Sequence, residues 1–346
     1  MSGLDQSLLI ATTGYHVGHQ RSIRVAEEQG FFQEEGFTDY IYDYRGLIPG
    51  PLEREGLALA MKEHGVDIAC GANVDSVVRQ REKGEEDLFI VAGWRYMTRP
   101  KVVSAKNITR IEHLKGKKIG LRELGGLSDR LIIVDMIKAG MDPEKDVEWV
   151  MDPVFAYPDS QEHADMLRQG KVDAMTTSGG YARQLVEEGY NLLLDGGAPE
   201  RRRRPGRAIV ATRQTIEHRG EELVAFLRAN LRAFWFWGDP GNFDYLYDLE
   251  TRMREKFTHN EHERHLRIVR RAPSMEDSLM PLDGAVDAKE LQYVIDEMQL
   301  LGEVNKPLKA EDMLRGEFME RGFRELCERP ALKATAAKVV GAMNAK

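Results

Sequence analysis

The sequence has few cysteines and no long apolar run. Its two cysteines, Cys70 and Cys327, lie far apart, so a disulfide framework is not indicated. No stretch approaches the ~18 apolar residues that a membrane-spanning helix needs. The segment 1–16 lacks the basic stretch followed by an apolar run that is typical of a secretory signal. As written, the sequence therefore predicts a cytoplasmic protein, or a periplasmic one if Met1 is not the natural start.

The sequence also lacks an excess of positive charge and the common metal-binding motifs. Its formal net charge of -8 excludes a general attraction to nucleic acid or to an anionic membrane, so an anion site must be local. Neither HExxH, CxxC nor an EF-hand pattern occurs. His259, His262 and His265 recur at every third position, but the charged sequence around them is typical of a solvated helix face. We expect no metal, no cofactor and no direct insertion into a membrane.

The length and the pattern of the chain favour two α/β domains. At 346 residues and 42% hydrophobic content, the chain can bury a sizeable core but is long for one compact domain. Short apolar runs alternate with amphipathic segments, beginning with a predicted strand over Ser7–Thr12 and a predicted helix over Arg21–Gln33. Such alternation predicts mostly parallel sheets with helices on both faces.

Two short apolar strands mark the predicted domain boundaries. Residues 101–105 (KVVSA) and 208–212 (AIVAT) flank a second alternating block, and we interpret them as two crossings between lobes. One lobe then comprises residues 1–101 plus 207–346, and the other comprises residues 102–206.

Two segments after the second block have a distinct composition. The run from Arg201 to Arg204 is flanked by prolines, which predicts a solvated connector that does not hold ligand. From Glu217 onward, amphipathic segments predict an overwhelmingly helical structure.

Four stretches of the chain resemble one superfamily, and they occur in the correct order. They are VAEEQGFFQEEGF (25–37), RIEHLKGKKIGLRELGGLSDRLI (110–132), GKVDAMTTSGGYARQLVEEG (170–189) and DAKELQYVIDEMQLLGEVNKPLKAEDM (287–313). They are similar to type II periplasmic substrate-binding proteins, in the group that binds nitrate, aliphatic sulfonates, taurine and thiamine-precursor pyrimidines. The resemblance implies a two-lobed, venus-flytrap fold with a two-strand hinge that closes around a small molecule. It also implies an ABC-type transporter permease as a partner.

The candidate ligand contacts follow predicted strands, because ligands of open α/β sheets lie outside the carboxyl ends of the strands. In the first lobe they are Thr13, Gly14, Tyr15, His16, Tyr44, Arg45, Gly71, Ala72, Asn73, Trp94, Arg95 and Tyr96. In the second lobe they are Gly125, Gly126, Leu127, Ser128, Thr177, Ser178, Gly179 and Tyr181.

Each group of candidates has a structural alternative. The loop 13–16 matches by position the loop that touches ligand in the resembling family, although it could serve as a plain surface connection. Residues 71–73 are small enough for a ligand to approach the backbone, but a turn with a helix cap at Asn73 would account for them equally well. In the second lobe, 125–128 and 177–179 could offer N–H groups and hydroxyls to an anion, or simply begin helices.

Aromatic and arginine residues at strand ends suggest the class of ligand. Trp94 and Arg95 follow a predicted strand, and an aromatic ring beside a guanidinium suits a planar carboxylate or a sulfonate. The alternative is a buried Trp94 with Arg95 in solvent. We therefore expect a small organic anion, either an aromatic carboxylate or a sulfonate.

The sequence leaves binding and catalysis open, and we favour binding. Enzymes occur on the same scaffold, with desulfinase, decarboxylase or thiamine-precursor synthase activity. The desulfinase-like branch has a cysteine in the loop after the first strand, where this chain has Tyr15 and His16. Cys70 fits a small buried residue better than a nucleophile. If the protein is an enzyme, His16 is the candidate general base; if it only binds, we predict a substrate-binding component of an ABC-type transporter.

Overall fold

The chain divides into two compact units in the computed structural model. The described residues are 8–12, 17–37, 41–43, 61–63, 65–96, 100–121, 129–156, 161–177, 179–198, 204–254 and 281–344. Unit 1 comprises Met1–Tyr96 and Pro205–Lys346, and unit 2 comprises Met97–Arg204. The unit boundaries therefore fall just before the strand expected at 101–105 and just before the one expected at 208–212.

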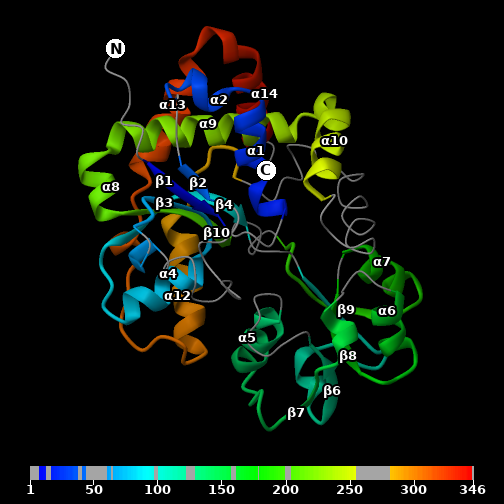
Figure 1. Ribbon diagram of the computed structural model, residues 1–346. Helices are drawn as coiled ribbons and strands as arrows, with labels where there is room; N and C mark the ends of the chain where they lie inside the picture. Colours follow the sequence, from blue (N-terminus) through cyan, green and yellow to red (C-terminus); the bar gives the residue numbers. More distant parts are fainter. Residues whose placement is uncertain are drawn as a thin grey trace. The chain divides into compact units, whose positions relative to one another are not determined.

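Unit 1 is built on a five-stranded sheet in the order β2-β1-β3-β10-β4 (Figure 1). Its strands are β1 (Leu9–Thr12), β2 (Ile41–Asp43), β3 (Ile68–Asn73), β4 (Leu88–Tyr96) and β10 (Pro205–Thr212). Its helices include α1 (Val17–Glu28), α2 (Phe31–Glu34), α4 (Val74–Glu82), α8 (Arg213–His218), α9 (Gly220–Gly238), α10 (Phe243–Arg254), α12 (Ala288–Leu300), α13 (Glu317–Glu328) and α14 (Lys333–Asn344). Strand β10 runs antiparallel to both of its neighbours, and the other strands share one direction.

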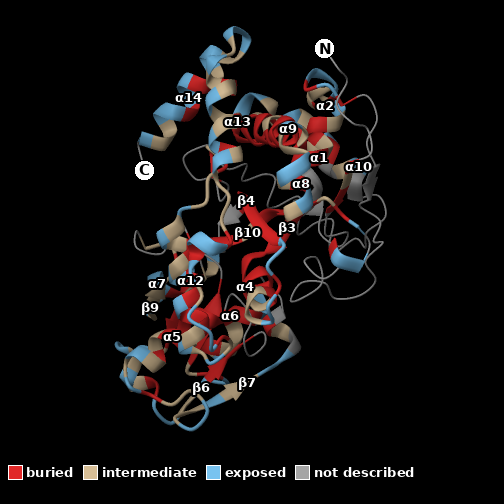
Figure 2. Ribbon diagram, turned by 90° about the vertical axis from the view of Figure 1, so that its left-hand side faces the viewer, coloured by how far each residue is buried: buried red, intermediate tan, exposed pale blue. Residues whose placement is uncertain are grey.

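Helices cover both faces of the sheet in unit 1. Alternate strand residues such as Ile10 and Ile209 belong to a core that also contains apolar residues of α1, α9 and α13. Their neighbours Ala11 and Val210 belong to a second core with residues of α4 and α12. Strands β3 and β10 and helix α9 are accordingly mostly buried (Figure 2). A strand that is covered on both faces has a nearly continuous apolar sequence. Such short apolar runs were the basis for predicting strands from the sequence.

The first predicted helix is interrupted in the structure. Helix α1 ends at Glu28, and α2 begins at Phe31 after Gly30, whose φ is +72°. A left-handed backbone conformation ends an α-helix, and glycine adopts it without the steric cost of a Cβ atom. The single helix predicted over Arg21–Gln33 is therefore corrected to two helices.

Unit 2 repeats the strand order of unit 1. Its sheet has the order β7-β6-β8-β5-β9. The strands are β5 (Lys101–Ser104), β6 (Lys117–Gly120), β7 (Val147–Val150), β8 (Ala174–Thr177) and β9 (Asn191–Asp195), and the helices include α5 (Arg130–Lys138), α6 (Gln161–Arg168) and α7 (Gly179–Glu187). Strand β5 is antiparallel to β8 and β9 and occupies the place that β10 has in unit 1. Each unit thus contains one antiparallel strand at the fourth position of its sheet.

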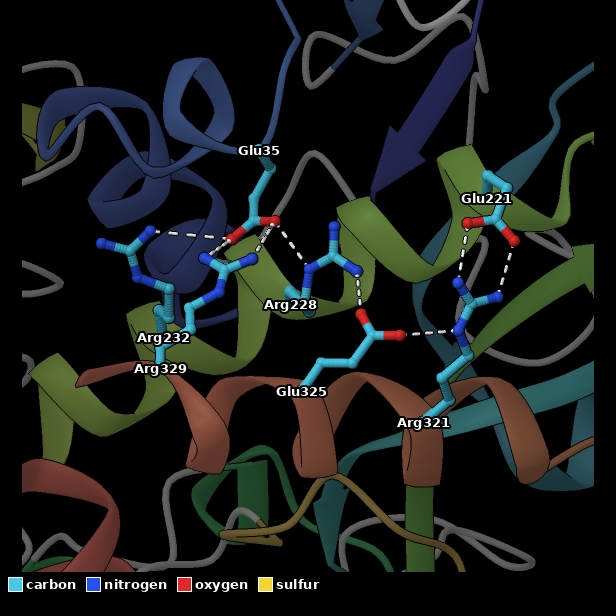
Figure 3. Close-up of polar contacts among 7 residues, drawn as sticks. All are labelled: Glu35, Glu221, Arg228, Arg232, Arg321, Glu325 and Arg329. Carbon is cyan, nitrogen blue, oxygen red and sulfur yellow. Dashed lines mark hydrogen bonds and ion pairs between the residues drawn. The ribbon is translucent and has the colours of Figure 1, made fainter. Parts of the chain in front are cut away.

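An ion-pair network fastens α2, α9 and α13 to one another in unit 1 (Figure 3). Its centre is Glu35, which follows α2 and whose side chain is 1% exposed. Glu35 accepts hydrogen bonds from Arg228 Nε at 2.6 Å and from Arg329 Nη2 at 2.8 Å, and Arg232 Nη1 lies 3.7 Å from its Oε1. The hydrogen bond to Glu35 raises the pKa of Arg329 above its ordinary value. One buried carboxylate therefore holds three guanidinium groups.

The same network continues along α9 and α13. Glu325 accepts hydrogen bonds from Arg228 and Arg321. Arg321 also donates to both carboxylate oxygens of Glu221, at 2.6 and 2.7 Å.

Within the described residues, no helix is long and apolar enough to cross a membrane.

Candidate functional site

The carboxyl ends of the parallel strands define one edge of the sheet in unit 1. Strands β1, β3 and β4 end at this edge, at Thr12, Asn73 and Tyr96. The antiparallel strand β10 begins there, at Pro205. Because ligands of open α/β sheets bind beyond the carboxyl ends of the strands, residues at this edge are the candidates for ligand contact.

Three polar residues form a row across β3, β10 and β4 at this edge. Arg207 of β10 pairs in register with Asn73 of β3 on one side and with Arg95 of β4 on the other. Residues directly opposite each other in a sheet have Cβ atoms about 4.5–5.5 Å apart, and like charges at that spacing repel. The row thus places Arg207 in register between Asn73 and Arg95.

Arg207 is a candidate site residue that the sequence interpretation missed. It lies shortly after the run 201–204, which was interpreted as a solvated connector. The sequence feature that could have identified Arg207 is its position at the start of an apolar strand. An antiparallel strand begins at the edge of the sheet where its parallel neighbours end. Arg204, at the end of the predicted solvated run, is also only 6% exposed, which corrects that interpretation for this residue.

Gly71 introduces a β-bulge next to the row. Its φ is +79°, and the pairing of β3 with β10 passes from Cys70 directly to Ala72, so Gly71 is the extra residue. Bulges of this kind bend a strand and redirect the side chains around it. Arg207 Nη1 donates a hydrogen bond of 2.9 Å to the Gly71 carbonyl oxygen. The bulge thereby positions the Arg207 guanidinium at the edge of the sheet.

Replacing Gly71 by alanine is expected to destabilise the protein by about 1–2 kcal/mol, because a Cβ atom disfavours the left-handed conformation by that amount. Urea unfolding measures the change. Gly341→Ala is the control, since Gly341 lies in α14 with open space around it and alanine should be neutral or slightly stabilising there. Equal midpoints for Gly71→Ala and the parent protein would show that the bulge does not need glycine.

Asn73 occupies the N-cap position of α4 without capping the helix. Asn73 is 8% exposed, and its side chain makes no capping hydrogen bond. Its Oδ1 has no hydrogen-bond partner among the described residues. An N-cap asparagine ordinarily accepts a hydrogen bond from an N–H group of the first helical turn. The side-chain geometry therefore does not support the alternative in which Asn73 is an ordinary helix cap.

The equivalent row in unit 2 is electrically neutral. Lys101 of β5 pairs in register with Thr177 of β8 and with Asp195 of β9. Its ammonium group forms an ion pair with the Asp195 carboxylate. The cation at the edge in unit 2 therefore has an acidic partner on the neighbouring strand of its own sheet.

A buried polar network fixes the strand end and a helix start in unit 2. Thr176 Oγ1 donates a hydrogen bond of 2.7 Å to Asp129, the N-cap residue of α5. His163 Nε2 donates one of 2.7 Å to the Thr176 carbonyl oxygen. All three residues are buried, as is Arg130, the first residue of α5. The sequence interpretation missed these four residues, because single polar residues within amphipathic segments form no motif.

An aromatic residue predicted at the ligand site packs into the core instead. Trp94 is 3% exposed and makes an edge contact with Phe234 at a ring-centroid distance of 5.5 Å. The prediction that the Trp94 ring is free to stack on a ligand is therefore corrected. Tyr181 is partly buried against a core cluster of unit 2, and its contact with ligand stays a prediction. The face that a strand residue covers depends on the helices packed against the sheet, which the strand sequence does not show.

Many of the predicted contacts lie outside the described residues. These are Thr13, Gly14, Tyr15, His16, Tyr44, Arg45, Gly125, Gly126, Leu127, Ser128 and Ser178, together with His259, His262, His265 and the run 201–203. For Arg95 and Tyr96 the backbone is described, and their side chains are outside the described part. The predicted contacts described at strand ends are Gly71, Ala72, Asn73 and Thr177, and Gly179 begins α7.

Neither cysteine is suited to act as a nucleophile. Cys70 is fully buried in β3, and burial raises the pKa of its thiol well above the ordinary value. Cys327 lies on α13, where burial also raises its thiol pKa. A raised pKa lowers the fraction of reactive thiolate. In the described ranges, no group of three or more His, Cys, Asp or Glu residues is placed to hold a metal ion.

Comparison with known proteins identifies a family and a shared fold. The family described as NMT1/THI5 like matches residues 20–239. No curated protein matches the sequence. The periplasmic sulfonate-binding protein SsuA from Methylobacillus flagellatus KT is 15% identical, with a TM-score of 0.65 over 96% of this chain and 97% of that chain.

Two further solved structures show the same likeness. The periplasmic aliphatic sulphonate binding protein SsuA from Escherichia coli is 16% identical, with a TM-score of 0.61 over 90% of this chain and 92% of that chain. The desulfurization enzyme DSZB is 14% identical, with a TM-score of 0.54 over 93% of this chain and 99% of that chain. At these identities, the likeness shows the fold alone.

Proposed function

Because the chain belongs to the NMT1/THI5-like family, we propose that it captures a small organic anion as the substrate-binding component of an ABC-type transporter. The predicted fold class, that of type II periplasmic binding proteins, is confirmed by the solved structures that share its fold. An aromatic carboxylate or a sulfonate is the ligand that we propose. The transporter role would place the protein in the periplasm.

One observation carries the proposal: Arg207 and Arg95 are paired in register at the carboxyl edge of β10 and β4. Guanidinium groups bind carboxylates and sulfonates through paired hydrogen bonds, which gives directional recognition as well as charge. Because the net charge of the chain is -8, this attraction is local to the edge of the sheet.

The catalytic alternative has less support in the structure. DSZB is described as a desulfurization enzyme, and it shares the fold. Catalysis through a covalent intermediate needs an activated nucleophile. Both cysteines of this chain have raised thiol pKa values. A covalent mechanism through either cysteine is therefore disfavoured, and binding is the function that we propose.

A thermal-shift screen tests the proposal. We expect benzoate, benzenesulfonate or ethanesulfonate to raise the melting temperature, because a ligand at 100 times its Kd stabilises a protein by about 2.7 kcal/mol. Glucose and magnesium chloride are the controls. Stabilisation by these controls alone would refute the anion-binding proposal. If chromatography shows that the protein converts a bound anion to product, catalysis replaces binding as the proposed function.

A further inference from the structure

The carboxamide oxygen of Asn73 is a buried hydrogen-bond acceptor at the candidate site. Asn73 is 8% exposed, and its Oδ1 has no partner among the described residues. A buried polar atom without a partner costs free energy, and such atoms in native proteins are mostly satisfied by protein groups, water or ligand. The N-cap position offers Asn73 the N–H groups of the first turn of α4, yet its side chain makes no capping bond.

The neighbouring guanidinium does not satisfy this oxygen. Arg207 lies directly opposite Asn73 in the sheet, and its Nη1 donates to the carbonyl oxygen of Gly71 at 2.9 Å. An acceptor thus lies beside a cation at the edge where ligands of this fold class bind. A ligand that matches both groups has an anionic group and, close to it, an N–H or O–H hydrogen.

Position distinguishes Asn73 from another buried asparagine with an unpartnered oxygen. Asn230 is 2% exposed, and its Oδ1 also lacks a partner among the described residues. It lies within α9, whose surrounding residues belong to the hydrophobic core of unit 1. Asn73 instead ends β3 at the carboxyl edge and precedes the nine-residue helix α4. Of the two amide oxygens, only that of Asn73 is therefore a candidate ligand contact.

We propose that Asn73 makes the protein selective for small organic anions that carry a hydroxyl or amino hydrogen near the anionic group. The ligand donates this hydrogen to Asn73 Oδ1, while its anionic group lies beside Arg207. This inference rests on the proposed anion-binding function and adds a second requirement to the ligand. An anion without a donor leaves the amide oxygen unsatisfied and so binds more weakly.

Matched ligand pairs measure this selectivity. The pairs are ethanesulfonate with 2-hydroxyethanesulfonate, benzoate with 3-hydroxybenzoate, and benzenesulfonate with 3-hydroxybenzenesulfonate, each titrated calorimetrically into the full chain. For at least one pair, we expect the hydroxylated member to bind about three- to tenfold more tightly, as one neutral hydrogen bond provides. In Asn73→Leu the ratio should fall to about one.

Control variants separate the hydrogen bond from effects on folding. Asn230→Leu removes the other buried amide and should keep the parent ratio. Asn73→Ala removes the acceptor without adding bulk, so it replaces Asn73→Leu if the leucine variant fails to give the parent circular dichroism spectrum.

An unchanged affinity ratio in a folded Asn73 variant overturns the inference but does not contradict anion binding. Equal affinities within every pair for the parent protein, as an ordered water on Oδ1 would produce, also overturn it. Binding of no anion at all overturns both this inference and the proposed function.

Discussion

Arg207→Ala is expected to weaken the binding of a small organic anion by about 2–5 kcal/mol, the usual cost of truncating one partner of a desolvated charge pair. Arg207 lies between Asn73 and Arg95 in the sheet, and its guanidinium is oriented by the Gly71 carbonyl oxygen. Isothermal titration with the anion found in the thermal-shift screen measures the loss. Arg207→Lys should restore only part of the affinity, because an ammonium group cannot make the paired hydrogen bonds of a guanidinium.

The topologically equivalent cation supplies a matched control. Lys101 occupies the same place in the sheet of unit 2, but it is paired with Asp195. Lys101→Met should therefore change anion affinity by much less than Arg207→Ala. If the two variants lose the same affinity, or if Arg207→Ala binds as tightly as the parent, the charge that holds the ligand does not come from the row in unit 1.

Glu35→Ala is expected to lower the free energy of unfolding by about 3–5 kcal/mol. Removing one partner from a buried ion pair leaves the other charge uncompensated, which is the costly case. Here one carboxylate, 1% exposed, is hydrogen-bonded to Arg228 and Arg329 and lies near Arg232 (Figure 3). The remaining arginines would repel one another between α9 and the end of α13. Denaturant unfolding followed by circular dichroism measures the loss.

The neighbouring glutamate is the natural control for this substitution. Glu34 forms an ion pair with Arg232, but its side chain is 59% exposed. Exposed ion pairs contribute about 0–1 kcal/mol, so Glu34→Ala should change stability only slightly. Comparable losses for the two alanine variants would mean that burial does not set the strength of the network. Glu35→Gln separates charge from shape, since it keeps the size of the side chain and removes the charge that compensates the arginines.

Local patterns predicted the elements better than their contacts. Alternating apolar and amphipathic segments predicted two α/β blocks, because strands with two covered faces and amphipathic helices each leave a periodic signature. Gly30 marks the break in the first helix, but the break could not be predicted with this glycine alone. A single glycine does not by itself distinguish a helix end from a tolerated interior position. The burial of Trp94 could not be predicted from its own strand, since its partner Phe234 is on a helix far away in the sequence.

The sequence by itself determined the fold class, because the apolar periodicity and four family-like stretches are properties of contiguous residues. It also indicated the strand ends at which Asn73, Arg95 and Thr177 lie. Only the tertiary structure decided which of these residues meet. Arg207 contacts Gly71 across 136 positions of the chain, and its register beside Asn73 and Arg95 depends on β10 inserting between β3 and β4. Strand pairing over such distances is set by the packing of whole helices and sheets, which no local pattern in the sequence reports.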